Sequence, residues 1–586
     1  MERAQPTYGG LKQVFAVSLG LFIVFIDSTI VNIALPDIIA DYGIGLSEAS
    51  WIINSFVITL AVLLVTMGKL ADLFGRARFF LIGLFLFMIS SFLCGAAPSE
   101  ESLIIYRILQ GISGAMVIPT SMMLVRSAVP PEKAGLAMGI WGAVGALAVA
   151  IGPSLGGVIT EQINWRWVFY INVPVIFIGL PLTWLVFRGT KETRKPFRID
   201  LWGTLALSTT LFFLTYSILQ GQEFGWSDWK IIAGFAISVI GIAAFIVIEK
   251  KVKDPLLDFA ILRNRAFVSG IASNLLSGII LMGTMILLPL FLTKVKGFDT
   301  LEAAFAITPL SAVMLVVAPI VGRLIDKVGY AWPMTLGYLF TLAGYILLST
   351  VHADMSIGRL VAYIAVAGVG IGIIMVTSVT VSTSVVSQEQ VSLASGIFAM
   401  MRNLGGAIGV ALFVSITLTS LNNQSSAIVD DGIAKFKEAG LPAVVQDQAI
   451  ARLEERRDDF FDFNAPPADF QLSDGQKQEL IEQKMSEAMA ALPAGTKLPP
   501  EKQKELLAKL EAEMIAVEGK VAEIRLSIQK QGEEDVAQSM GKAFLSGLIL
   551  TALFSVTLLF LRRKSIEGGL SSPTGKGSAS SFRSFE

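Results

Sequence analysis

The 586-residue chain is poor in charged residues, cysteine and histidine. Asp, Glu, Lys and Arg together make up 16% of it, whereas about 25% is usual for a soluble protein. The net charge is −1, so no strong basic field indicates nucleic acid as a partner. The one cysteine, Cys94, lies in an apolar block and cannot form an intramolecular disulfide. The one histidine, His352, lies in a short loop, and a lone histidine does not make a metal site.

Two sequence patterns that would indicate other mechanisms are also missing. The chain has no phosphate-binding loop of the form Gly-x-x-x-x-Gly-Lys-Ser/Thr, which argues against direct use of ATP. No cleavable signal peptide is evident, because the first apolar block contains Asp27 and is too long for the apolar region of such a peptide. We therefore expect this block to be retained as a membrane span, and we expect no cofactor.

Hydrophobic residues make up 53% of the chain and gather in blocks. Blocks of about 18 to 25 residues are long enough to cross a hydrocarbon core of about 30 Å as helices. Charged or Gly-, Pro- and Asn-rich breaks separate fourteen such blocks. They lie at residues 14–39, 51–68, 79–97, 103–125, 136–160, 168–187, 202–220, 231–249, 267–293, 304–322, 333–350, 358–382, 393–421 and 541–561. The sequence therefore predicts an all-α polytopic membrane protein with fourteen spans.

Lysine and arginine are distributed unevenly between the two sets of loops. With the N-terminus inside, the segments near the spans on the inner side hold 22 of these residues, and the short outer loops hold 5. Cytoplasmic loops are enriched in lysine and arginine. Both termini are therefore predicted to be cytoplasmic, in a cell or plasma membrane.

One loop sequence occurs twice. Residues 68–76 (GKLADLFGR) follow the second span and residues 322–330 (GRLIDKVGY) follow the tenth. A motif repeated at equivalent places is typical of transporters built from two helical repeats. We therefore predict a six-helix half at 1–200, an inserted helix pair at 201–250 and a second half at 251–421 plus 541–562. An extracytoplasmic loop at 422–540 and a disordered tail at 563–586 complete the chain.

Five segments, in order along the chain, carry a family pattern. They are residues 27–36 (DSTIVNIALP), the loop at 68–78, 107–111 (RILQG), 152–157 (GPSLGG) and 165–174 (WRWVFYINVP). Together they resemble the major facilitator superfamily, in particular its fourteen-span drug:proton antiporter branch of the QacA/EmrB type. Leu73 and Ala77 stand where the loop motif usually has basic residues, and Ala148 where the fifth span usually has glycine. The resemblance implies multidrug efflux driven by a proton gradient, and hence antibiotic resistance.

Asp27 is the one carboxylate that the sequence places deep in a predicted span. A bare carboxylate is costly there, so it should face a cavity or take up a proton. Its affinity for a proton changes between a dry setting and one with water or a nearby cation. That change can couple proton flow to substrate movement. The alternative is a structural carboxylate held by Ser28, Thr29 or Asn32.

Other polar residues in the spans are candidates for coupling or for substrate contact. By resemblance, Arg107 belongs to the proton-coupling machinery, although an arginine near a helix end can also snorkel to the surface. Gln110 follows on the same helical face. Arg402 and Asn403 either line a cavity and bind an anionic group or are polar packing residues. With Asn32 and Gln110, they are the residues that we expect in a substrate cavity.

Glycines give the fifth span a smooth and bendable face. Gly152, Gly156 and Gly157 permit close helix packing, and Pro153 frees a backbone carbonyl. This face suits a helix that rocks between two states, and ordinary close packing explains it equally well.

The repeated loop is predicted to be a cytoplasmic gate. By resemblance, Asp72 and Arg76 form a charge lock between helices, next to Gly68 and to the turn at Gly75. Asp326 is their counterpart in the second half. A solvated loop would explain the basic residues, but not the repeated spacing of glycine and aspartate.

Residues 422–540 differ in composition, with 14 Lys and Arg against 23 Asp and Glu. A heptad stripe of apolar residues at 507–528 continues upstream at 481–492, and the stretch at 493–500 separates the two. This predicts an antiparallel helical hairpin whose second arm runs into the last span, with shorter helices near 428–438 and 443–457. The alternative is an acidic, mostly solvated insertion. By topology the loop lies outside, where it could meet an envelope partner.

The function that the sequence favours is secondary active export of amphipathic compounds, with a preference for cationic ones, by proton antiport. The same scaffold could export a lipid or lipid-like envelope component. Proton-coupled uptake is disfavoured by the fifth-span motif, and a non-transporting receptor by Asp27 and Arg107. We expect a transporter rather than an enzyme, with the lipid bilayer, protons and hydrophobic or cationic small molecules or lipids as partners.

Overall fold

A computed structural model describes residues 10–188, 200–252, 255–387, 390–457, 460–461, 474–490 and 499–561. Within these ranges, 14 helices are long and apolar enough to cross a membrane. They are α1 (Leu11–Tyr42), α2 (Leu46–Phe74), α3 (Arg76–Gly95), α4 (Glu100–Ser127), α5 (Ala134–Gln162), α6 (Trp167–Tyr170) together with α7 (Asn172–Phe187), α8 (Leu201–Phe224), α9 (Trp229–Glu249), α10 (Arg265–Lys294), α11 (Thr300–Val328), α12 (Ala331–Leu348), α13 (Ile357–Ser384), α14 (Val391–Glu438) and α17 (Pro500–Ser555).

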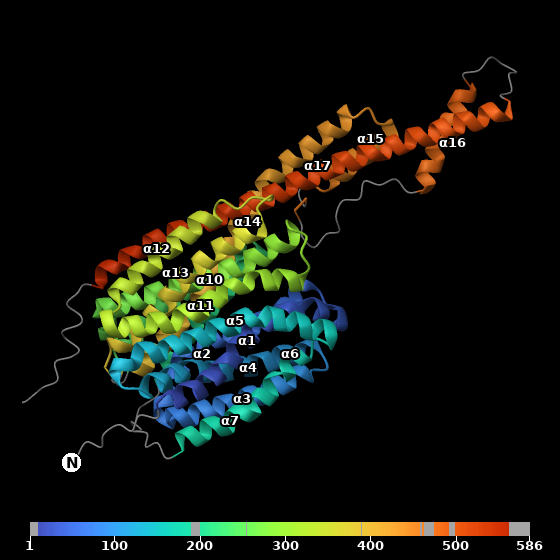
Figure 1. Cartoon of the computed structure of the whole chain (residues 1–586). Coiled ribbons are helices and arrows are strands. Elements are labelled where there is room, and N and C mark those ends of the chain that lie inside the picture. Colours follow the sequence, from blue (N-terminus) through green and yellow to red (C-terminus); the bar gives the residue numbers. More distant parts are fainter. Residues whose placement is uncertain are drawn as a thin grey trace, which may run out of the picture.

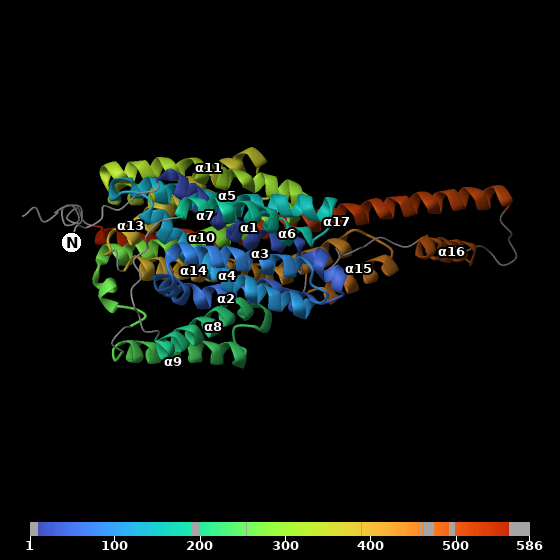
Figure 2. The same cartoon turned by 90° about the horizontal axis from the view of Figure 1, so that it is seen from below.

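The helices form two six-helix halves and an inserted pair, as predicted. Helices α1 to α7 make the first half, and α10 to α14 with the end of α17 make the second (Figure 1). The inserted helices α8 and α9 pack on each other at the edge of the bundle, and α8 also contacts α2 and α14 (Figure 2). The two halves meet mainly where α5 packs on α11 and α2 on α14. Each of the fourteen predicted blocks matches one of these spans, and three of them, 79–97, 333–350 and 541–561, run a few residues past the end of the helix.

Polar side chains in the short loops cap the N-termini of several spans. Ser99 caps α4 and Asn264 caps α10, and Asp299 at the start of α11 forms a capping box with Glu302. These side chains accept hydrogen bonds from backbone N–H groups that a helix start leaves without partners. The loops therefore stop and restart the helices at defined positions, which fixes where each span begins.

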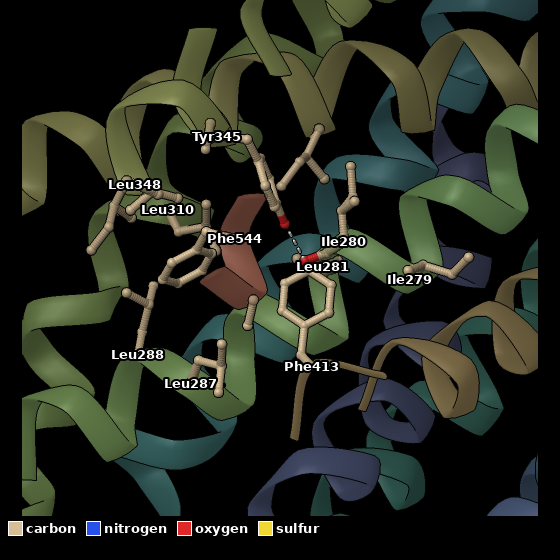
Figure 3. Packing of buried hydrophobic residues seen from close by; sticks show 14 of the residues in the cluster. Ile279, Ile280, Leu281, Leu287, Leu288, Leu310, Tyr345, Leu348, Phe413 and Phe544 are labelled. Carbon is tan, nitrogen blue, oxygen red and sulfur yellow. Dashed lines mark hydrogen bonds between the residues drawn. The ribbon is translucent and has the colours of Figure 1, made fainter. Parts of the chain in front are cut away.

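The last span packs into the second half through three aromatic rings. Tyr345 of α12, Phe413 of α14 and Phe544 of α17 form edge-to-face pairs with centroids 6.0–6.4 Å apart, a favoured geometry for aromatic pairs. The buried hydroxyl of Tyr345 donates to the carbonyl oxygen of Ile280 at 2.8 Å (Figure 3). The sixth helix of this half is thus supplied by a segment that follows the long insertion.

The insertion forms a helical arm that extends beyond the bundle (Figures 1 and 2). It consists of the end of α14, α15 (Ala443–Glu455), α16 (Asp474–Ala490) and the first part of α17. Lys477 and Lys484 of α16 pair with Glu518 and Glu513 of α17 at 2.7 and 3.2 Å, so these helices are antiparallel. The predicted antiparallel hairpin is therefore confirmed for the described residues, although most side chains of α16 and of the first part of α17 are exposed, as the solvated alternative expects. The tail at 563–586 lies outside the described residues.

One predicted boundary in the arm is wrong. Residues 428–438 do not form a separate short helix, because α14 continues without a break from the bundle to Glu438. Phe436 and Ile428 on this extension are fully buried, and with Leu453 of α15 and Ile528 of α17 they belong to the apolar core of the arm. Burial of that stripe allows the helix to continue after it leaves the bundle.

We name the two ends of the bundle from these features. The end where α2 meets α3 at Gly75 is the inner end, which the count of lysine and arginine predicts to face the cytoplasm. The arm lies at the opposite, outer end (Figure 1).

Candidate functional site

A network of buried polar side chains lies in the first half, centred on Asp27 of α1. Arg107 of α4 pairs with Asp27, with Nη1 2.6 Å from Oδ2. The amides of Gln110 of α4 and Asn172 of α7 each donate to Asp27 Oδ1 at 2.9 Å. Both amides also donate to the hydroxyl of Ser91 on α3, at 2.7 and 3.1 Å. No member is more than 1% exposed, so four helices converge on one desolvated carboxylate.

Arg107 is held from several sides. Its Nε donates to the carbonyl oxygen of Ile52 at 3.0 Å, and its Nη1 also donates to Gln110 Oε1 at 2.7 Å. The guanidinium carbon lies 4.2 Å from the ring centroid of Phe56 and 5.8 Å from that of Phe169. At 1% exposure, the side chain does not snorkel to the surface. Paired and hydrogen-bonded in this way, the guanidinium can remain charged in an apolar setting.

The three residues considered as structural partners of Asp27 do not hold it. Ser28 donates to the carbonyl oxygen of Phe25 and Thr29 to that of Ile26, which is the usual local bonding of hydroxyls in a helix. The side chain of Asn32 is exposed. Asp27 is instead satisfied by residues that lie 80, 83 and 145 positions away.

Sequence reasoning missed Asn172 and Ser91 as members of the network. Asn172 lies in the motif at 165–174, two residues before Pro174, and an uncharged amide gives no charge signal there. Ser91 is one of many hydroxyls in the spans. Charged residues stand out in apolar spans because they are costly there, whereas amides and hydroxyls do not.

The network can exchange an ion pair for a proton. A charged Asp27 accepts hydrogen bonds from three side chains and pairs with Arg107. When Asp27 takes up a proton, the ion pair is lost and the buried guanidinium needs a new partner or water. Protonation of Asp27 would therefore be linked to the packing of α1 against α4 and α7.

At the inner end, Asp326 of α11 clasps the start of α5 across the two halves. Its Oδ1 accepts from the backbone N–H of Gly135 at 2.8 Å and its Oδ2 from that of Leu136 at 3.1 Å. A carboxylate at a helix N-terminus is favourable because it meets unpaired N–H groups and the positive end of the helix dipole. Backbones approach closely here, since a Cβ on Gly135 would lie 2.4 Å from the carbonyl oxygen of Gly322.

The first-half copy of the loop makes a related contact with α14. Arg76 pairs with Asp72 in its own half at 2.9 Å and donates to the hydroxyl of Ser392, at the start of α14, at 3.1 Å. A Cβ on Gly68 would lie 3.2 Å from the carbonyl oxygen of Ser392. Gly75 has φ +91°, which strains any residue with a side chain. The residues of the repeated loop thus meet the opposite half in both copies, Asp326 directly and Asp72 through Arg76.

We expect Asp326→Asn to open the inner end more often. Charge-assisted hydrogen bonds contribute about 1.5–3 kcal/mol, and exposure of Asp326 reduces this to about 1 kcal/mol. The inner end should therefore open about fivefold more often.

The rate at which a cysteine introduced at Ala318 is labelled measures this opening. Ala318 is 2% exposed and lies beside Gly139, and the native Cys94 is fully buried and does not compete for the label. Glu132→Gln, at an exposed position just before α5, should label at the unmodified rate. Equal rates in both variants would show that Asp326 does not hold the inner end closed.

The glycines of α5 face two different helices. A Cβ on Gly152 would lie 2.0 Å from Thr29 Oγ1, and one on Gly156 would lie 2.9 Å from the carbonyl oxygen of Ile30. These two glycines therefore pack on α1 within the first half. Gly157 lies between α11 and α1, with Leu301 Cδ1 3.6 Å and Ile33 Cγ2 3.9 Å from an added Cβ. Pro153 lies inside α5.

The four expected cavity residues do not meet at one place. Gln110 belongs to the buried network, and Asn32 is exposed on α1. Arg402 and Asn403 lie where α14 meets the first half. Asn403 donates to the carbonyl oxygen of Val57 at 3.4 Å, and the Arg402 guanidinium carbon lies 4.6 Å from the ring centroid of Phe25.

Comparisons with known proteins agree with this architecture. A family model described as Major Facilitator Superfamily matches residues 17–410. The tetracenomycin C resistance and export protein of Streptomyces glaucescens is 31% identical over 74% of this chain and 80% of its own length. The multidrug resistance protein Stp of Mycobacterium tuberculosis is 32% identical over 76% and 81%. The crystal structure of the human organic anion transporter MFSD10 is similar in fold, with a TM-score of 0.52, 16% identity, and coverage of 69% of this chain and 93% of that one.

Proposed function

The chain belongs to the major facilitator superfamily, and from this premise we propose that it exports amphipathic compounds as a proton-driven multidrug efflux transporter. The relatives named above are resistance and export proteins. We also propose the transport mechanism, which is alternating access: the two halves rock about their interface and open the substrate site to one side of the membrane at a time.

The observation that supports proton coupling is the fully buried Asp27 in its network. A carboxylate with 0% exposure inside a span is costly unless it is paired or protonated. Here it is paired with Arg107 at 2.6 Å, and protonation would break that pair. We propose that Asp27 takes up a proton from one side of the membrane and releases it when α1 moves relative to α4 and α7.

Closure of the inner end supports alternating access. Asp326 clasps α5, Arg76 reaches α14, and Gly135 and Gly322 bring the two backbones together. These contacts join opposite halves at one end of the bundle, so they must break if that end is to open. We propose that the inner end is the cytoplasmic side, with both chain termini, and that this arrangement is the inward-closed state.

Transport by the purified protein in liposomes tests the proposal. We expect an imposed pH gradient to drive movement of ethidium, a cationic dye, or of an acidic dansyl probe, and collapse of the gradient by a protonophore to stop it. Labelled phospholipid serves as a third cargo, because the same scaffold could export a lipid. If no cargo responds to the gradient, the protein is not a proton-driven exporter of these compound classes.

The arm is expected to be dispensable for proton coupling. The network of Asp27 and Arg107 lies wholly in the first half, whereas the arm joins the second. Residues 428–532 can be replaced by a short Gly/Ser linker, because a Cβ on Gly532 would lie 3.6 Å from Ile428 and the cut ends are therefore neighbours. We expect pH-driven transport in liposomes within about twofold of the full chain, since no transport contact is removed.

Cells give the complementary measurement for the arm. If the arm docks an envelope partner, the shortened protein should lose protection of cells while it keeps transport in liposomes. Lost transport in liposomes by a correctly folded shortened protein would place the arm within the transport mechanism.

A further inference from the structure

Arg402 of α14 lies where the second half meets the first, and the described residues supply no anionic partner for its guanidinium. Its guanidinium carbon lies 4.6 Å from the ring centroid of Phe25 on α1. Its Nη1 is buried and has no hydrogen-bond partner in the described part of the chain. Arg107, by contrast, has both an ion pair and hydrogen bonds. Arg107 is thus fully buried and paired, whereas Arg402 is partly buried and its buried Nη1 lacks an acceptor among the described residues.

A buried donor without an acceptor is unusual in a native structure and calls for an explanation. Most buried polar groups are hydrogen-bonded, and the cost of leaving one unpaired is greatest for charged groups. Contact with an aromatic face offsets part of this cost, but it leaves the N–H donors of Nη1 unused. The acceptor that fits a guanidinium fork best is a carboxylate or a similar oxyanion, which it binds through two parallel hydrogen bonds.

Asp27 does not serve as that acceptor. It lies two residues beyond Phe25 on α1, yet its two oxygens are occupied by Arg107, Gln110 and Asn172. For the same reason Asp27 is not free to pair with a cationic substrate in this state. The unsatisfied charge at this part of the interface between the halves is thus positive.

The surroundings of Arg402 are apolar and adaptable. Phe25 packs against Gly145 of α5, where an added Cβ would lie 2.8 Å from the ring. Gly406 lies one turn after Arg402 on α14. Met282 of α10 packs there, with its Cγ 3.0 Å from a Cβ built on Gly406. Met282 and its neighbour Met285 pack against the buried clusters of both halves. Methionine side chains repack around differently shaped ligands, so this wall suits apolar bodies of variable shape.

We propose that Arg402 binds the acidic group of an amphipathic substrate, with Phe25, Met282 and Met285 around its apolar body. This inference rests on the proposed export function and names its substrate class as acidic amphiphiles, which differs from the cationic preference that the sequence favoured. Occupation by a carboxylate would draw the guanidinium away from Phe25, on the same helix as Asp27. Substrate binding and the proton site would then share α1.

Binding by the purified full chain tests the inference with matched fluorescent probes. The probes are 11-(dansylamino)undecanoic acid and its methyl ester, which differ only in the charge of the head group. We expect the acid to bind more tightly than the ester. Arg402→Gln should weaken binding of the acid by about tenfold or more and leave the ester unchanged, because one charged contact is lost. Arg402→Lys, which keeps the charge but not the fork, should fall between the two.

The outcomes separate this inference from the proposed function. If Arg402→Gln weakens acid and ester equally in a protein whose unfolding temperature is unchanged, the guanidinium is structural and the inference is wrong. If pH-driven ethidium transport is intact but the acid binds no better than the ester, export stands and the acidic site does not. If the pH gradient drives transport of neither ethidium nor the dansyl acid, the proposed export function is wrong instead. A comparison with dansylglycine, which lacks the chain, distinguishes lipid-derived acids from compact acidic compounds, and preferential acid binding in either form supports the inference.

Discussion

Asp27→Asn is expected to reduce pH-driven export to the level of empty liposomes. The substitution keeps the size of the side chain and removes its ability to take up and release a proton. Gln110 and Asn172 can still hydrogen-bond an amide at this position, but Arg107 loses its ion pair. Transport of a cationic dye and of the acidic dansyl probe, driven by an imposed pH gradient, measures the effect.

Stability must be separated from coupling in this experiment. Removal of one partner from a buried ion pair typically costs about 3–5 kcal/mol, so Asp27→Asn also lowers the free energy of unfolding. The double variant Asp27→Asn/Arg107→Gln removes both charges and should recover much of that loss. We expect it to fold better than the single variant and still to lack proton-driven transport. Undiminished transport in either folded variant would show that Asp27 is not the proton carrier.

Gly156→Leu is the second change from which we expect a large effect, with transport reduced about tenfold or more. An added Cβ alone would lie 2.9 Å from the backbone oxygen of Ile30 and 3.0 Å from its side chain. A backbone atom cannot rotate away, so α1 and α5 must separate near Asp27. Insertion of extra carbon atoms into a packed core costs about 1–3 kcal/mol, and here it also displaces the proton site.

The same substitution in open space provides the control. Gly358 near the start of α13 has nothing within 4 Å of an added Cβ, so Gly358→Leu should leave both the unfolding temperature and transport unchanged. Initial export rates and thermal unfolding of the two variants can be measured side by side. Normal transport by Gly156→Leu would mean that α1 and α5 do not pack closely through the transport cycle.

The fold was largely predictable because the hydrocarbon core imposes one length on every span. Each of the fourteen blocks was visible as apolar sequence, and the paired loops at Gly68 and Gly322 revealed the two halves. The arm was harder. The polar run at 422–426 predicts the end of a span at residue 421, yet α14 passes through it. A helix that leaves the membrane is held by arm residues such as Leu453, which lie far along the chain and give no local signal.

The candidate site was predictable in part for a similar reason. Asp27 and Arg107 were identified because charge is rare in apolar sequence, and the repeated motif identified Asp326. Their partners could not be found in this way, since Asn172 reaches Asp27 across 145 positions and Ser91 resembles many other serines in the spans. The unpaired state of Arg402 was also hidden, because absence of an acceptor can be seen only when the surrounding helices are in place.

Because α14 and α17 run without a break from the bundle into the arm, a tilt of these helices in the bundle would also tilt the arm. At 56 residues, α17 is about 84 Å long as a straight helix, and it joins the tip of the arm to the last span without an intervening loop. A small tilt of the second half would therefore become a sweep of the arm tip that is larger than any displacement within the bundle. A protein bound at the tip would sense each turnover as motion, and a pair of spin labels, one at the tip and one in the loop between α8 and α9, would measure the same cycle.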